Sequence, residues 1–176
     1  MAKIIENSTM RIAITGPEST GKTTLATALS LELGLPLSNE YARLFLEIND
    51  GTYTEPDLVF MAKEQYLLND KLDTGCGIIA DTEMMVFVVW SQVKYGRCSE
   101  KIIELFKGQR FDHYLLCYPD LPWENDMLRE SPLFEDRIAL FNEYRSQFEK
   151  ARLPYHVVKG NGLKRLANAL TAISHH

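Results

Sequence analysis

Cysteine is scarce in this chain, and its few positions exclude two classes of site. Only three cysteines occur among 176 residues, and no two of them have C-x-x-C spacing. An odd number of scattered cysteines argues against a disulfide framework, and the missing pair argues against a zinc site. We therefore expect Cys76, Cys98 and Cys117 to be buried or incidental thiols in a reducing compartment.

The sequence also lacks long apolar runs and an excess of positive charge. Its longest apolar run, Met84 to Trp90, is far short of the roughly 20 residues of a membrane-spanning helix. The amino terminus has neither the apolar core nor the cleavage site of a signal peptide. Because the net charge is −5 and the isoelectric point is about 5.4, no global basic field attracts nucleic acid or anionic lipid. We predict a cytoplasmic protein that binds neither nucleic acid nor membrane, and the sequence leaves its oligomeric state open.

The hydrophobic content is sufficient for one core. At 45% hydrophobic residues, the chain can bury a sizeable interior, but its length is too short for two ordinary domains. No internal repeat or low-complexity segment is visible. We expect residues 1–176 to form a single domain.

A phosphate-binding pattern lies near the start of the chain. Residues 16–23 read Gly-Pro-Glu-Ser-Thr-Gly-Lys-Thr and fit G-x-x-x-x-G-K-[ST]. The pattern alone is compatible with a chance match in a glycine-containing turn. Its context argues for the motif, because an apolar strand-like run at 10–15 precedes it and Leu25, Leu29 and Leu33 follow on one helical face. We therefore predict a nucleotide-binding loop.

Each part of this loop has a predicted role. The backbone N–H groups of the loop converge on a phosphate, and the positive end of the following helix faces the same anion. Lys22 reaches between the β- and γ-phosphates, while the hydroxyl of Thr23 is placed to bind Mg²⁺, with Thr24 as a second hydroxyl. The residues expected to contact the nucleotide are Gly16, Glu18, Ser19, Thr20, Gly21, Lys22, Thr23 and Thr24.

The rest of the chain alternates strand-like and helix-like segments. Strands are predicted at 10–15, 37–39, 78–80, 114–118 and 155–158. Helices are predicted after the phosphate loop as far as Gly34, and at 43–48, 54–73, 84–95, 100–107, 132–151 and 163–173. This alternation predicts an α/β protein with the three-layer P-loop NTPase fold, in which a five-stranded parallel sheet has helices on both faces.

Asp81 follows the buried strand at 78–80. In P-loop NTPases an acidic residue at this place holds magnesium directly or through water. The alternative is an aspartate that only caps the next turn. We favour a metal site formed by Thr23 and Asp81, with Thr82 as a candidate helper beside the acceptor.

Glu40 and Arg43 follow the second predicted strand. Their spacing puts them on one face if the segment is helical, so a surface ion pair is one interpretation. The other is a role in the site, because the carboxyl ends of neighbouring parallel strands line one crevice. There Glu40 could orient a sugar hydroxyl or accept its proton. The sequence does not choose between these two interpretations.

A lid is predicted over about residues 119–137, where proline and charge are abundant. Guanidinium groups on a lid can stabilise the transferred phosphoryl group while water is excluded, so Arg129 and Arg137 are candidates. Solvated arginines on a polar loop are the alternative. For Trp123 we favour packing over stacking on a base.

Two pairs of ring residues are given structural roles. His113 and His156 have no companion at ligand spacing, which favours ordinary histidines over metal ligands. Tyr41 and Tyr53 could line a ring-binding pocket. For both tyrosines we favour packing in the core or at the rim.

These motifs together resemble the ribosylnicotinamide kinase domain of NadR-type proteins, within the P-loop nucleoside and nucleotide kinases. The resemblance covers most of the chain. The residues that carry it are Gly-Pro-Glu-Ser-Thr-Gly-Lys-Thr-Thr at 16–24, Glu40-Tyr41-Ala42-Arg43, Tyr53-Thr54 with Asp57 and Gln65, Asp81-Thr82, and Leu121-Pro122-Trp123 with Asp126 and Leu128-Arg129.

The resemblance implies ATP- and Mg²⁺-dependent transfer of the γ-phosphoryl group to the 5′-hydroxyl of a ribonucleoside. It implies catalytic roles for Lys22, Glu40, Asp81 and Arg129. NadR-type kinases place an aromatic residue just before the Glu-Tyr-x-Arg stretch to stack on the pyridine ring, whereas this chain has Asn39. Nicotinamide riboside is the favoured acceptor, and another nucleoside or nucleotide is the runner-up.

A regulatory P-loop ATPase without a small-molecule acceptor is the rival class. The discriminating feature is a second cavity beside the γ-phosphate. A kinase needs such a cavity for its acceptor, and we expect Glu40 and the helix over residues 54–66 to wall it. A switch ATPase instead needs a positioned water and a contact with a partner.

Overall fold

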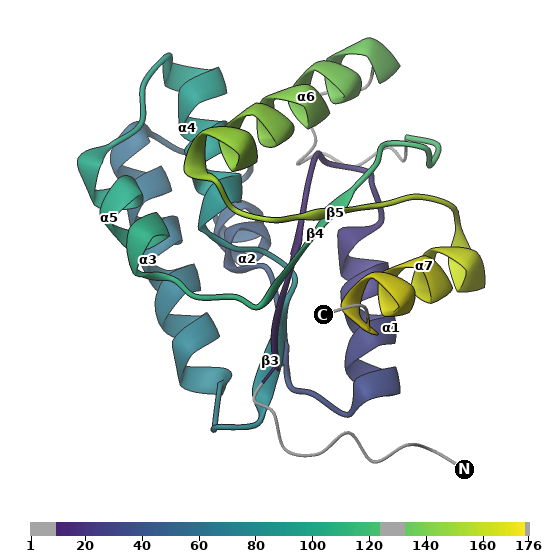
Figure 1. Ribbon diagram of the computed structural model, residues 1–176. Coiled ribbons are helices and arrows are strands. Elements are labelled where there is room, and N and C mark those ends of the chain that lie inside the picture. Colours follow the sequence, from purple (N-terminus) through teal and green to yellow (C-terminus); the bar gives the residue numbers. More distant parts are fainter. Residues whose placement is uncertain (1–9, 124–132, 175–176) are drawn as a thin grey trace.

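A parallel sheet of five strands forms the centre of the molecule. The structure, a computed structural model, describes residues 10–123 and 133–174. The strands are β1 (Met10–Thr15), β2 (Leu37–Ser38), β3 (Gly77–Ala80), β4 (His113–Cys117) and β5 (His156–Val158). Their spatial order is β2-β3-β1-β4-β5, so β1 lies between β3 and β4 (Figure 1). The carboxyl ends of all five strands therefore meet at one edge of the sheet, with the phosphate loop at its middle.

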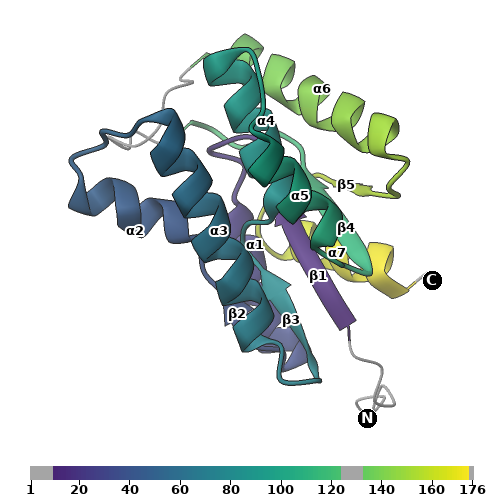
Figure 2. The same ribbon diagram turned by 90° about the vertical axis from the view of Figure 1, so that its left-hand side faces the viewer.

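Helices cover both faces of this sheet. They are α1 (Lys22–Leu33), α2 (Tyr41–Ile48), α3 (Glu55–Leu72), α4 (Met84–Tyr95), α5 (Glu100–Gly108), α6 (Phe134–Ala151) and α7 (Gly162–Ser174). Figures 1 and 2 show α1 and α7 on one face, and α3, α4 and α5 on the other. The predicted three-layer P-loop fold is confirmed. Within the described residues, none of the helices is long and apolar enough to cross a membrane.

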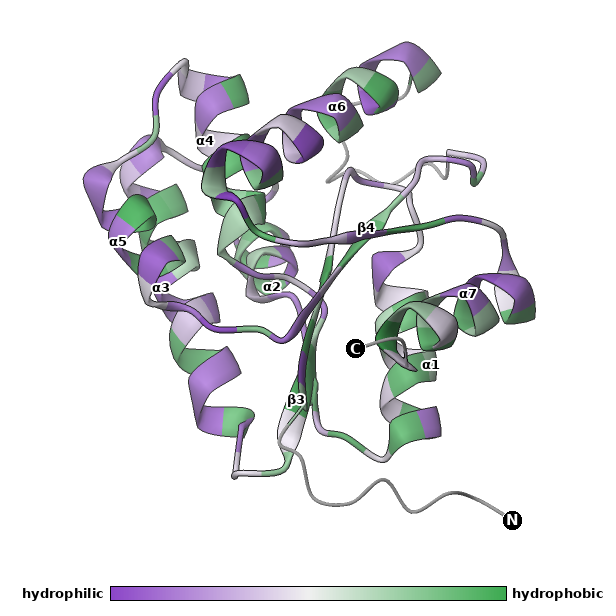
Figure 3. Ribbon diagram, in the orientation of Figure 1, coloured by the Kyte–Doolittle hydropathy of each residue, from purple (hydrophilic) through white to green (hydrophobic). Residues whose placement is uncertain are grey.

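The two hydrophobic cores follow from the alternation of side chains along the strands. Ile12 and Ile14 of β1 belong to the cluster formed with α1 and α7, whereas Ala13 belongs to the cluster on the opposite face. In β4, Leu115 and Leu116 divide between the two clusters in the same way. Figure 3 shows hydrophobic residues gathered on the strands and on the helix sides that face them.

Element boundaries differ from the predictions by one or two residues at several ends. Helix α3 begins directly after Thr54 with a capping box, in which the backbone N–H of Thr54 donates to the side chain of Asp57 at 2.8 Å. Helix α2 begins at Tyr41, two residues earlier than expected. The reason is tertiary, since the N–H of Tyr41 donates to the side chain of Gln65 on α3 at 2.7 Å.

Gly77 gives the first testable prediction. Its φ of 93° lies in the left-handed region, and a Cβ atom there would collide with the backbone of Met10 in the paired strand. We expect Gly77→Ala to lower the free energy of unfolding by about 3 kcal/mol, from backbone strain together with the steric clash. Urea denaturation measures this change.

Gly75 provides the matched control. It has the same φ of 93°, but a Cβ atom there would meet nothing within 4 Å. Gly75→Ala should therefore cost only the backbone term of about 1 kcal/mol. Equal losses in the two variants would show that the close approach of β1 and β3 contributes nothing.

Candidate functional site

The loop after β1 has the curled backbone that a phosphate site needs. Gly16 has φ of 130°, and a Cβ atom there would lie 2.9 Å from the carbonyl oxygen of Cys117, so only glycine fits. Ser19 is held in the left-handed region at φ of 53°, a conformation that costs a non-glycine residue on the order of 1 kcal/mol. The hydroxyl of Thr20 donates to the carbonyl of Pro17 at 2.7 Å and closes the curl. Successive N–H groups in such a turn form an anion-binding concavity.

Lys22 lies across this loop. Its ammonium donates to the carbonyl oxygens of Gly16 and Pro17 at 2.9 and 2.8 Å. A lysine ammonium has three N–H donors. Two are engaged by these described contacts, so the third is available for a phosphate oxygen at the same loop.

Arg165 holds the loop from the opposite side. This α7 residue is 4% exposed, and its guanidinium donates to the carbonyl oxygens of Thr20 at 2.7 Å and Tyr118 at 2.8 Å. It also pairs with Asp120 at 2.7 Å. In a trans peptide the C=O and the next N–H point in opposite directions. Because Arg165 binds the carbonyl of Thr20, the N–H of Gly21 points away from Arg165 and α7.

Asp81 lies at the end of β3 as predicted, and it is 2% exposed. Burial raises the pKa of its carboxyl group to about 6, and the charge of Glu40 acts in the same direction. A hydrogen bond with Thr23 and the charges of Lys22 and Arg43 act to lower the pKa. Oδ1 of Asp81 is buried and has no hydrogen-bond partner among the described residues. The structure therefore brings Asp81 beside Thr23, the loop residue with which it was predicted to hold a metal ion.

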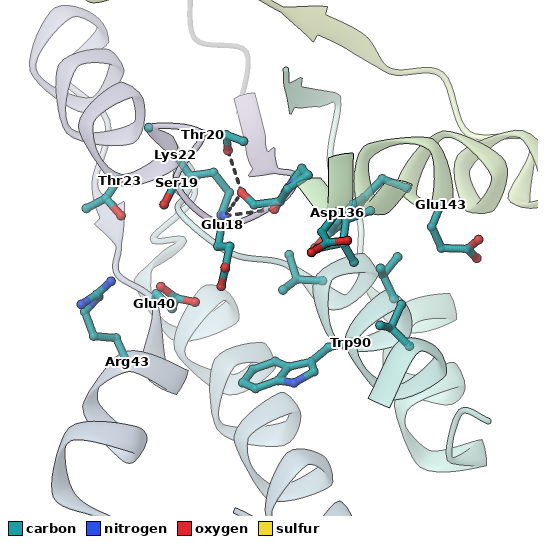
Figure 4. A pocket seen from close by; sticks show the side chains of 18 of the residues that line it. Glu18, Ser19, Thr20, Lys22, Thr23, Glu40, Arg43, Trp90, Asp136 and Glu143 are labelled. Atoms are coloured by element: carbon teal, nitrogen blue, oxygen red, sulfur yellow. Dashed lines mark hydrogen bonds between the residues drawn. The ribbon is translucent and has the colours of Figure 1, made fainter. Parts of the chain in front are cut away.

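A cavity of about 930 Å³ opens beside the loop. This volume is at the upper end of the range of small-molecule sites. Its described lining consists of residues 16–24, Glu40, Arg43, Leu46, Gly51, Tyr53, Val86, Val89, Trp90, Gln92, Val93, Lys94, Leu121, Pro122, Asp136, Ala139, Leu140, Glu143 and Tyr144. Figure 4 shows Glu18, Glu40 and Trp90 extending into this space.

The structure separates the residues predicted near the acceptor. Glu40 and Arg43 both line the cavity, although Glu40 is the N-cap of α2 and only Arg43 lies within the helix. Nη1 of Arg43 also lies 3.9 Å from Oε1 of Glu47. Arg43 therefore forms a surface ion pair with Glu47, whereas the ion pair considered from the sequence was between Arg43 and Glu40. Tyr41 and Thr82 are not part of the described lining: the ring of Tyr41 packs on Phe60, and Thr82 is buried.

The wall opposite the loop was not predicted. Sequence reasoning assigned it to the helix over residues 54–66, but the described lining contains no residue of α3, and α4 and α6 provide the wall instead. Val86, Val89, Trp90 and Val93 line the cavity at the i, i+3, i+4, i+7 spacing of one helical face. This apolar stripe on α4, of which Val86 and Val89 also belong to the core, is the signal that could have revealed the wall.

The two ends of the predicted lid are described, and a hydrogen bond joins them. Arg137 is 4% exposed, and its guanidinium donates to the carbonyl of Leu121 at 3.0 Å. It is not part of the described lining, so the structure places it in support of the segment that contains Leu121 and not at the cavity. Arg129 lies outside the described residues, and its lid role stays a prediction.

Comparison with known families identifies the chain. A family model described as an AAA domain matches residues 11–165, from β1 to α7. The chain belongs to this family. The matched part of the AAA domain includes the phosphate loop, Asp81 and Arg165. A comparison with curated proteins found no match.

Solved structures similar to this AAA domain include kinases. NadR in complex with NAD and AMP-PNP has a TM-score of 0.74 at 23% identity, over 94% of this chain and 48% of the NadR chain. Thymidylate kinase from Ehrlichia chaffeensis gives 0.65 at 16%, over 94% and 97%. Deoxyadenosine kinase from M. mycoides gives 0.64 at 16%, over 93% and 98%. The fold is thus the one shared by these proteins, and this chain spans about half the length of NadR.

The buried carboxyl of Asp81 yields a prediction on stability. Its pKa is raised from 3.8 to about 6 in the folded protein, so the folded state holds the proton more tightly than the unfolded state. Its contribution is fully present below about pH 4 and is lost as the pH rises through about 6. Without nucleotide or magnesium, Asp81→Asn should therefore be more stable than the natural protein by about 1–3 kcal/mol at pH 7, with little difference near pH 4. Urea denaturation at both pH values provides the comparison, and a constant difference would contradict the assigned pKa.

Proposed function

We propose that this protein is an ATP- and Mg²⁺-dependent kinase that transfers the γ-phosphoryl group to the 5′-hydroxyl of a ribonucleoside, with nicotinamide riboside as the acceptor. The observation that carries the proposal is that the phosphate loop also forms one wall of the cavity. Residues 16–24 form the phosphate loop and also line the cavity of about 930 Å³. A donor phosphate on the loop would therefore face a second molecule in the cavity, which is the arrangement that in-line transfer needs.

The acidic residues divide the remaining tasks by position. Glu40 lines the cavity, so it would orient the 5′-hydroxyl of the acceptor and receive its proton. Asp81 lies beside Thr23 and is not part of the described lining, so it belongs to the donor side. Lys22 would bind the donor phosphates through its remaining N–H group and neutralise the charge that develops on transfer.

The residues present fit a magnesium ion. Asp81 has a buried Oδ1 without a described partner, and a hydrogen bond links its carboxyl group to the Thr23 hydroxyl. Hydroxyl and carboxylate oxygens are the ligands that Mg²⁺ takes, with phosphates and waters completing its shell. Thr23 and Asp81 would hold the ion, which supplies charge neutralisation at the β- and γ-phosphates when bound.

The charge and ring content of the cavity favour a cationic base. Four acidic and three basic side chains belong to its described lining, and one of the basic ones, Lys22, serves the donor. The indole of Trp90 faces the same space and is held by a hydrogen bond from its Nε1 to the Tyr53 hydroxyl at 2.8 Å. A pyridinium ring gains from both features, through cation–π stacking on tryptophan and through the excess of carboxylates.

Trp90 could also replace the stacking aromatic residue that this chain lacks at Asn39. The aromatic residue expected just before the Glu-Tyr-x-Arg stretch would have come from the end of β2. Here an aromatic ring reaches the cavity from α4. The solved structure of NadR in complex with NR, at 23% identity and a TM-score of 0.73, is consistent with an acceptor of this class.

A panel of acceptors tests the proposal. The protein is incubated with ATP, Mg²⁺ and either nicotinamide riboside, its uncharged dihydro form, adenosine, thymidine or thymidine monophosphate, and ADP formation is measured. We expect acceptor-dependent ADP formation with nicotinamide riboside, at a kcat/KM about tenfold or more above that of the dihydro form, because only the former carries the ring charge. A preference for one of the other acceptors would support the kinase activity and reject nicotinamide riboside as the acceptor.

Lys22→Ala serves as the catalytic control in this panel. Loss of its ammonium should abolish turnover and leave the melting temperature nearly unchanged, because the side chain is only partly buried. ADP release that is equal with and without any acceptor would reject the kinase in favour of a regulatory ATPase.

Trp90 provides a separate prediction on the acceptor. Trp90→Leu removes the aromatic face but keeps an apolar side chain, so the KM for nicotinamide riboside should rise about tenfold or more while the KM for ATP stays within about twofold. Trp90→Phe, which retains a ring, should have a smaller effect. Steady-state kinetics with each substrate varied in turn measures the two KM values. An unchanged KM for the acceptor in Trp90→Leu would show that the indole does not contact the acceptor.

A further inference from the structure

Two buried amide side chains on α3 connect the ends of two strands. Gln65 is fully buried and Asn69 is 3% exposed. Asn69 donates to the carbonyl of Thr82 at 3.1 Å and accepts from Gln65 Nε2 at 3.0 Å. Burying an amide costs free energy unless its polar atoms are paired, and here they are. Such a network fixes positions, whereas an apolar residue would only fill space.

Gln65 binds the backbone on both sides of Glu40. Its Nε2 donates to the carbonyl oxygen of Asn39 at 3.1 Å, and its Oε1 accepts from the N–H of Tyr41 at 2.7 Å. One side-chain amide thus holds the residue before Glu40 and the residue after it.

These two contacts determine the direction of the Glu40 side chain. The Asn39 carbonyl belongs to the peptide plane before the Glu40 Cα atom, and the Tyr41 N–H belongs to the plane after it. Because peptide groups are planar, holding both planes fixes the φ and ψ angles of Glu40, which are −68° and 110°. With both angles fixed, the Cα–Cβ bond can point in only one direction.

Gln65 also provides a hydrogen bond at the start of α2 that the side chain of Glu40 does not provide. Glu40 is the N-cap of α2, a position whose side chain usually accepts a hydrogen bond from the first turn, but it makes no such bond. The first N–H groups of a helix need partners, and Gln65 provides one for Tyr41. The carboxylate of Glu40 can therefore face the cavity, which it lines.

We infer that Gln65 is a positioning residue that holds Glu40 at the acceptor side of the site. The inference rests on the proposed function, in which Glu40 orients the acceptor hydroxyl. Misplacement of a reacting group by about 1 Å can cost up to about 100-fold in rate, so the effect should be large on the acceptor and absent on ATP.

Gln65→Glu and Gln65→Met test the inference. The glutamate keeps the acceptor for the Tyr41 N–H, but its second oxygen faces the oxygens of Asn39 and Asn69. Only the protonated acid can therefore restore both hydrogen bonds to the backbone of Asn39 and Tyr41. We expect the kcat/KM ratio of Gln65→Glu to the natural protein to be near one at about pH 5.5 and to fall about tenfold by pH 8. Gln65→Met, without donor or acceptor, should show that loss at every pH. The groups in contact with Gln65 are the backbone of Asn39 and Tyr41 and the side chains of Ser38 and Asn69, none of which titrates in this range.

Met61→Ala is the matched control. Met61 is fully buried one turn earlier on α3 and belongs to the core, so its truncation should lower the melting temperature without affecting the hydrogen bonds from Gln65 to the backbone of Asn39 and Tyr41. Its acceptor KM should stay at the natural value, and all variants should keep the natural affinity for ATP measured by titration without acceptor. A pH-independent ratio for Gln65→Glu, or an acceptor KM in Met61→Ala that rises as in Gln65→Met, overturns the inference. Absence of acceptor-dependent ADP formation in the natural protein would instead reject the proposed function.

Discussion

The direction of the peptide groups in residues 16–21 is the constraint on which the rest of the site depends. Carbonyl oxygens of this loop accept hydrogen bonds from cations at two positions: those of Gly16 and Pro17 from Lys22, and that of Thr20 from Arg165. Because the peptide between Thr20 and Gly21 is planar and trans, Arg165 directs the N–H of Gly21 away from itself. The same guanidinium binds the carbonyl of Tyr118, so α7 and the end of β4 together hold the loop that follows β1.

The turn between β3 and α4 buries two carboxyl groups with different partners. One oxygen of Glu83 accepts from the N–H of Met85 and from Gln109, both at 2.7 Å, and so begins α4. Asp81 instead faces Thr23 and Lys22, and its pKa is raised chiefly by burial. Burial raises the pKa of Glu83 as well. The fold bears the cost of desolvating both groups, which apolar packing of α4 against the sheet offsets.

The sequence predicted what local pattern determines and missed what tertiary packing determines. The loop, the five strands and the position of Asp81 follow from short motifs and from the rule that parallel strands end at one edge. Trp90 was missed because it ends a continuous apolar run, and such a run does not show which of its side chains pack in the core and which also line a cavity. The start of α2 and the setting of Arg137 depend on Gln65 and Leu121, partners distant in sequence.

Helix α4 serves the core and the cavity at once. Phe87 and Val88 pack in the core, Val86 and Val89 belong both to the core and to the cavity lining, and Trp90 and Val93 border the cavity. Val93 is 59% exposed, so a substitution there can alter the shape and polarity of the cavity with little disturbance of the core, whereas Trp90 stacks on Phe87. Such a position permits divergence: a lineage can acquire a new preference among small molecules by changing it, while selection for folding keeps the buried residues of the same helix as they were.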